Sequence, residues 1–189
     1  MTPARAVPRP AGRLAVAGGL ALVVAAALYA FGRTHTPAYA MGLFGQHGVA
    51  VNRLKAQLAT GMLGLALVQL TLALWMYRRL PGAGVAPPPV PVPVLHRVGG
   101  ASLFLLSLPV AVHCMFAYGV QLFDPRVAVH SLAGCFFYGA FAAKVLIVRS
   151  RRLPGWALPL AGGLLVTLVV IMWYSSALWY FDGSRLPQP

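Results

Sequence analysis

The fold of this chain is decided by two neighbouring stretches, SLFLLSLPVAVHCMFAYGV at residues 102–120 and VAVHSLAGCFFYGAFAAKV at residues 127–145. Each is long enough to cross a bilayer as a helix, which takes about 20 apolar residues. Each also contains a histidine, His113 or His130, in surroundings where an imidazole is costly to bury. The pair therefore predicts membrane-spanning helices that carry polar groups in their interior.

Composition indicates the same class for the whole chain. Of its 189 residues, 59% are hydrophobic and 9% are charged, whereas a soluble domain carries about 25% charged residues. We therefore expect an all-α integral membrane bundle in a single domain, residues 1–189, with an N-terminal helix followed by a four-helix core. The five expected spans are roughly 14–31, 56–77, 98–120, 127–148 and 156–181.

The net charge of +13 does not indicate a nucleic-acid partner, because the basic residues stand at the ends of the apolar runs. They are expected to set the topology and to contact anionic lipid head groups of the bilayer. The chain has only two acids, Asp124 and Asp182. Paired-carboxylate catalysis and a hard-cation site, which needs several carboxylate oxygens, are therefore not expected.

The basic residues also predict the orientation, because they are enriched in cytoplasmic flanks. Ten lie at one set of helix ends and five at the other, which places the N-terminus inside. The segment 80–95 is then a cytoplasmic loop, and its prolines predict a stiff spacer. The outer loop, residues 32–55, is long enough to fold over the bundle. The first span is expected to be an uncleaved helix, because its apolar run is long for a signal peptide.

Depth decides which histidines can share a ligand. His113 is expected about 6 Å and His130 about 10 Å from the membrane midplane, both toward the outer face. Two imidazoles at similar depth on consecutive helices predict a b-type haem with His113 and His130 as its axial metal ligands. His96 lies about 25 Å from His113 along the same helix, so it is excluded from their site and is expected at the interface.

Three further residues complete the expected cofactor site. Gly134 lies one turn after His130 and would leave room for a porphyrin, and Phe137 follows on the same face as a wall. Lys144 would meet a haem propionate, although snorkelling to the cytoplasmic interface also explains it.

Two other interpretations stay open. The histidines could be interhelical hydrogen-bonding groups in a non-catalytic membrane subunit or assembly factor. Alternatively, His113, Cys114 and Met115, with His130 and Cys135 nearby, could handle copper, since sulfur and imidazole suit Cu(I). The loop residues His35 and His47 are expected to be solvated, or to cover the outer edge of a haem.

Much of the chain resembles a family of bacterial multi-pass membrane proteins of unknown function. The resemblance covers residues 37–181 and rests on LKAQLATGMLGLALVQLTLALW (54–75), HRVGGASLFLLSLPVAVHCMFAYG (96–119), RVAVHSLAGCFFYGAFAAKVLIVRSRRLPGWALPLAGG (126–163) and WYSSALWYF (173–181). It implies a multi-pass protein of the bacterial cytoplasmic membrane.

The histidines more weakly resemble those of b-type membrane cytochromes of the cytochrome b561 and ferric-reductase kind. That likeness implies electron transfer through haem, with a quinone or a redox subunit as partner and a homo- or hetero-oligomer as the assembly. This chain departs from the pattern because a second haem would need a pair near the cytoplasmic face, where only His96 is available. One haem near the outer face is the most that it can hold, and at most the chain is an electron-transfer component.

Overall fold

The computed structural model describes residues 10–80, 88–150 and 153–183, and these residues form five long helices. Four are regular: α1 (Pro10–Thr34), α2 (Val49–Met76), α3 (Pro91–Ala117) and α4 (Pro125–Arg149). The fifth is α5 (Ala157–Trp173), continued by a π-helical turn, η1 (Tyr174–Leu178), and by α6 (Trp179–Phe181). All five are long and apolar enough to cross a membrane. The expected all-α class, with five helices able to cross a membrane, is therefore confirmed.

The third helix begins earlier than the sequence indicated. Residues 91–95 were expected to belong to the Pro-rich loop, but α3 starts at Pro91 and contains Pro93. A helix tolerates proline in its first turn, because the amide hydrogens there have no intrahelical acceptor. Residues 81–87 of the expected spacer lie outside the described residues.

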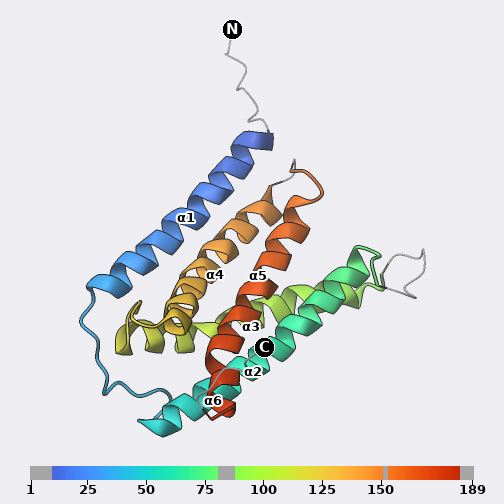
Figure 1. Cartoon of the computed structure of the whole chain (residues 1–189). Helices are drawn as coiled ribbons and strands as arrows, with labels where there is room; N and C mark the ends of the chain where they lie inside the picture. The colour runs from blue at the N-terminus through green and yellow to red at the C-terminus, as the bar shows by residue number, and fades with distance from the viewer. Residues whose placement is uncertain (1–9, 81–87, 151–152, 184–189) are drawn as a thin grey trace.

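The helices are arranged in an open order, in which each helix packs on one or two others instead of all five packing around one axis (Figure 1). α1 packs along α4, α4 packs along α5, and α2 contacts both α5 and α3. α1 and α4 approach closely at Gly139, because this residue has no side chain. A Cβ there would overlap the carbonyl oxygen of Ala21. α3 runs at an angle to α1, α4 and α5 in this view. α3 reaches α4 through side chains, with the rings of Phe104 and Phe141 stacked at 4.0 Å.

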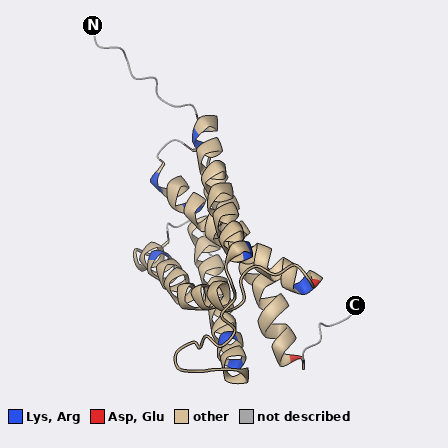
Figure 2. Ribbon diagram, turned by 90° about the vertical axis from the view of Figure 1, so that its left-hand side faces the viewer, with Lys and Arg blue, Asp and Glu red and all other residues tan. Residues whose placement is uncertain are grey.

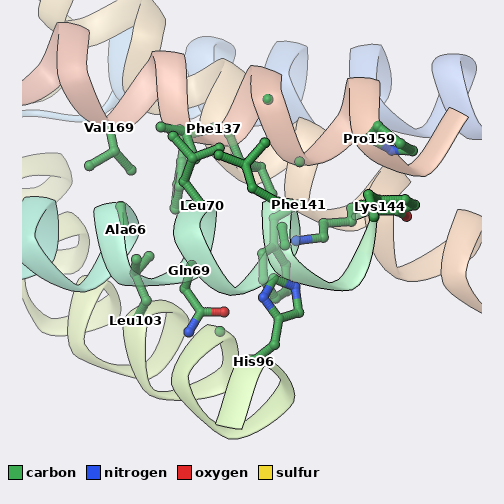
Figure 3. Close-up of a pocket in the computed structure, with 18 residues that line it drawn as sticks. Ala66, Gln69, Leu70, His96, Leu103, Phe137, Phe141, Lys144, Pro159 and Val169 are labelled. Atoms are coloured by element: carbon green, nitrogen blue, oxygen red, sulfur yellow. The ribbon is translucent and has the colours of Figure 1, made fainter. Parts of the chain in front are cut away.

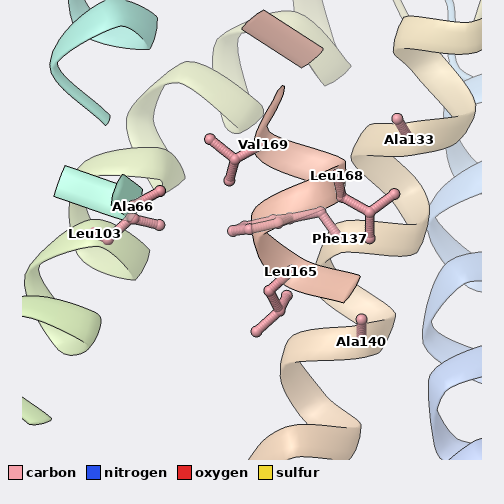
Figure 4. Packing of buried hydrophobic residues seen from close by; sticks show 8 residues of the cluster. All are labelled: Ala66, Leu103, Ala133, Phe137, Ala140, Leu165, Leu168 and Val169. Atoms are coloured by element: carbon pink, nitrogen blue, oxygen red, sulfur yellow. The ribbon is translucent and has the colours of Figure 1, made fainter. Parts of the chain in front are cut away.

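The buried apolar cluster lies where α4 and α5 meet α2 and α3 (Figure 4). Phe137, only 2% exposed, extends from α4 across α5 toward the other two helices. Large apolar side chains such as Leu22, Leu105 and Leu160 are instead more than 60% exposed, as expected of helices that face lipid. The full cluster comprises Ala66, Leu103, Ala133, Phe137, Ala140, Leu165, Leu168 and Val169.

The two ends of the bundle differ in how they are closed. At the end near His113, the α1–α2 loop folds back, and the amide of Ala38 donates to the carbonyl of Phe116 at 2.9 Å. At the same end, Asp124 caps α4 by accepting from the amide of Val127 at 3.0 Å. We call this the His113 end. The opposite end, where α3 and α5 begin, is the His96 end.

Candidate functional site

His113 is buried and hydrogen-bonded to the loop that covers it. It is 1% exposed, and its Nε2 donates to the carbonyl oxygen of Met41 at 3.0 Å. Its ring meets Tyr118 edge to face, with centroids 5.7 Å apart. The ammonium of Lys55 lies 4.4 Å from the centre of the same tyrosine ring. Within the described part of the chain, Nδ1 of His113 is buried and has no hydrogen-bond partner.

His130 has a different set of partners, in the π-helical turn of the fifth helix. Its Nδ1 lies 3.1 Å from Oγ of Ser175, which itself donates to the carbonyl of Ile171 at 2.7 Å. The same turn is held from α4 by Arg126, which donates to the carbonyl of Ser175 at 2.8 Å. The Arg126 guanidinium also lies 3.9 Å from the ring centre of Trp179. Single π turns inside α-helices are frequent at functional sites.

The contacts of His113 and His130 use one nitrogen of each imidazole. Nε2 of His113 and Nδ1 of His130 are each occupied by a hydrogen bond, one to the loop and the other to η1. Gly134 does not face open space, because a Cβ there would lie 3.9 Å from Sδ of Met172. Phe137 packs in the apolar cluster. Haem binding by these residues stays a prediction.

The other residues weighed for metal chemistry do not converge either. Cys114 and Cys135 are both free thiols. No group of three or more His, Cys, Asp or Glu residues gathers within residues 10–80, 88–150 and 153–183. His47 is exposed as expected, but His35 packs between the rings of Phe31 and Phe116, with centroids 5.2 and 5.0 Å away.

A cavity of about 170 Å³ lies near the His96 end, between α2, α3, α4 and α5. Most of its wall is apolar, including Phe137, Phe141 and Leu103, but four polar side chains also line it (Figure 3). They come from three helices and the residue after α2, and they are Gln69, Tyr77, His96 and Lys144.

The polar side chains are held in the cavity by their helices. Gln69 of α2 is 9% exposed and packs on α3, where a Cβ on Gly99 would overlap its amide nitrogen. Lys144 of α4 extends into the cavity, and its ammonium points toward the imidazole of His96 (Figure 3). Nε2 of Gln69 and Nδ1 of His96 are buried, and neither has a hydrogen-bond partner in the described structure.

The structure therefore places the residues of the expected haem site in two different regions. Phe137 and Lys144 line a cavity with His96, at the opposite end of the bundle from His113. As expected, His96 lies apart from His113 and His130. It was expected only at the membrane interface, but it also lines the cavity. Gln69 was missed, although one amide inside the apolar run LALVQLTLALW is a signal that could have identified it.

Comparison with known proteins gives a family and no activity. Residues 14–188 match a family described as "Family of unknown function (DUF6529)". No curated protein and no solved structure matches the chain.

Proposed function

Since the chain belongs to the DUF6529 family, a family of unknown function, we propose a function from its cavity. The protein binds the head group of a lipid-soluble molecule between α2, α3, α4 and α5, and it catalyses no reaction there. This proposal develops the interpretation of a non-catalytic membrane subunit. The observation that carries it is the Lys144 side chain, which extends into this cavity toward His96, whose buried Nδ1 has no hydrogen-bond partner in the described structure (Figure 3).

These polar groups are costly in the absence of a ligand. A buried donor or acceptor without a partner costs about 1–3 kcal/mol, and hydrocarbon supplies no water to replace it. A ligand oxygen in the cavity would accept hydrogen bonds and offset that cost. Polar groups of this kind inside a membrane protein are a common mark of a ligand or ion site.

The size of the cavity favours a head group over a whole ligand. Its volume of about 170 Å³ is below the roughly 300–1,000 Å³ of pockets that enclose drug-sized molecules. Two of its lining residues, Leu74 and Tyr77, are 37% and 42% exposed, so the cavity reaches the lipid-facing surface. A polar head would sit inside while an apolar tail lies in the bilayer.

We further propose that the protein lies in a bacterial cytoplasmic membrane, with its N-terminus and the His96 end inside. Lys and Arg residues lie mainly toward the ends of the helices (Figure 2). More of the chain's basic residues belong to the N-terminal side of the predicted topology, which favours this orientation.

The test is ligand binding by the purified full chain in uncharged detergent micelles, with and without a filled cavity. The probes are the fluorescent fatty acid cis-parinaric acid, its methyl ester, and a quinone with a decyl tail. We expect at least one to bind saturably, and Gly162→Leu to abolish that binding. A Cβ on Gly162 meets open space at the cavity wall.

Gly64→Leu is the matched control, because Gly64 is exposed on α2, has equal space for a Cβ and does not line the cavity. It should bind like the wild type. If no probe binds, or if Gly162→Leu binds like the control, the proposed function is wrong.

Electron transfer through a haem on His113 and His130 is the second candidate. One observation favours it, the buried Nδ1 of His113 that lacks a partner among the described residues. A visible spectrum of the purified protein tests it, since a b-type haem gives an α band and a Soret shift on reduction with dithionite. A protein without these bands rules haem out, and elemental analysis of the same sample tests copper.

A further inference from the structure

We propose that the cavity selects a ligand with an anionic oxygen head group, a carboxylate or a phosphate, bound by Lys144 and His96. The inference rests on the proposed function and specifies its ligand. It follows from the kinds of polar atoms in the cavity, from the charges around them and from the direction of the Lys144 side chain.

The polar atoms that await a partner favour an acceptor. The Lys144 ammonium can only donate hydrogen bonds. Nδ1 of His96, which is buried without a partner in the described structure, donates in one neutral tautomer and in the charged form. A ligand that brings one or two oxygens satisfies both groups at once, whereas a ligand that only donates leaves the Lys144 ammonium without an acceptor.

The charges around the cavity favour an anion over a neutral acceptor. No carboxylate lines the cavity, and the two acids of the chain, Asp124 and Asp182, flank helices at the His113 end. Asp124 is already beside Arg126, at 3.9 Å. The positive charge of Lys144 thus has no acidic partner in its surroundings, and an unpaired charge in a membrane interior is costly.

The direction of the Lys144 side chain distinguishes a site from a snorkelling lysine. A snorkelling side chain extends along its helix toward the head-group region. Lys144 instead extends into the cavity and points toward His96 (Figure 3). A lysine charge that faces a hydrogen-bonding imidazole across an apolar space favours an anion between the two groups, and charge-assisted hydrogen bonds are about twice as strong as neutral ones.

A fatty-acid carboxylate and a phospholipid phosphate both have this chemistry, so the experiment separates them. Binding of cis-parinaric acid is compared with that of its methyl ester, which has the same tail without the charge. Oleate, oleoyl lysophosphatidic acid and the decyl quinone then compete against bound cis-parinaric acid. Displacement by oleate alone identifies a carboxylate, and stronger displacement by the lysophosphatidic acid identifies a phosphate.

We expect the acid to bind about tenfold more tightly than the ester or better, because a hydrogen bond to a charged group is stronger than one to a neutral group. Lys144→Gln should remove this preference, and Lys144→Arg should retain it. Lys55→Gln, which changes the other lysine of the chain at the His113 end, should also retain it. The comparison of acid and ester in the wild type needs no variant, so misfolding of Lys144→Gln leaves the test intact.

Equal binding of acid and ester, or stronger displacement by the quinone than by either anion, would overturn the inference. If that binding is still lost in Gly162→Leu, the cavity remains a ligand site and only its selectivity for anions is wrong. If no probe binds at all, the proposed function and this inference fail together.

Discussion

Nδ1 of His130 lies 3.1 Å from Oγ of Ser175, within the one π-helical turn that the described residues contain. The carbonyl of the same serine accepts from Arg126 at 2.8 Å. α4 is therefore fastened to the fifth helix by two side chains, at the position where the backbone of that helix changes its hydrogen-bonding pattern. The contact explains how a histidine can be accommodated inside a membrane helix without binding a ligand.

Ser175→Ala should destabilise the protein by about 0.5–2 kcal/mol, because it leaves the half-buried imidazole of His130 without this partner. Thermal unfolding in detergent measures the change. Ser176→Ala is the matched control, since the Ser176 hydroxyl bonds only to the carbonyl of Met172 in its own helix. Equal effects of the two substitutions would show that the contact between His130 and Ser175 contributes nothing.

His113→Leu should loosen the loop that covers the His113 end, because it removes the hydrogen bond from Nε2 to the Met41 carbonyl. We expect a loss of about 1–3 kcal/mol of stability and faster hydrogen exchange at Ala38 and Leu43, whose amides are hydrogen-bonded in and around the loop. Mass spectrometry of exchanged peptides measures this. The exposed His47 is the control, and His47→Leu should change stability by less than about 0.5 kcal/mol. Unchanged exchange in His113→Leu would contradict this role.

Gly139→Ala should separate α1 from α4, since the added methyl group would overlap the carbonyl of Ala21. Overpacking of this kind costs about 1–3 kcal/mol. A thermal melt in detergent measures the loss, and Gly18→Ala in α1, where a Cβ meets nothing within 4 Å, should cause none. A neutral Gly139→Ala would mean that the two helices do not approach as closely as described.

Gln69→Met should stabilise the ligand-free protein by about 1 kcal/mol while weakening ligand binding. The substitution keeps the length of the side chain and removes a buried amide whose nitrogen has no partner in the described structure. Thermal unfolding with and without cis-parinaric acid measures both effects. Gln57→Met, at an exposed position of the same helix, should have neither effect. A less stable ligand-free variant would indicate that Gln69 has a structural role instead.

The sequence predicted the helices well, because the length of each apolar run shows directly whether it can cross a bilayer as a helix. The helix ends were predicted less well. The first turn of α3 includes Pro91 and Pro93, in a segment whose prolines indicate a spacer. The histidine contacts were harder to predict. His113 pairs with the backbone carbonyl of Met41, and a carbonyl that every residue possesses leaves no signature in a sequence.

The cavity was not predictable from the runs alone. Gln69, His96 and Lys144 stand on three different helices, and they meet because of the angle at which α3 packs against α2 and α4 (Figure 1). That angle depends on which side chains fill the space between the helices, such as the stacked Phe104 and Phe141. Hydropathy records how long a span is, but it does not record how steeply the span is tilted.

The open order of the helices has a consequence for how the protein is made. α1 finds its most extensive partner in α4, which is synthesised about a hundred residues later. The face of α1 that includes Ala21 therefore has no α4 to pack against until two further helices have been inserted. The cavity also forms late, because its walls are incomplete until α4 and α5 leave the translocation machinery. The polar interior is therefore assembled only after the fourth and fifth helices have been inserted.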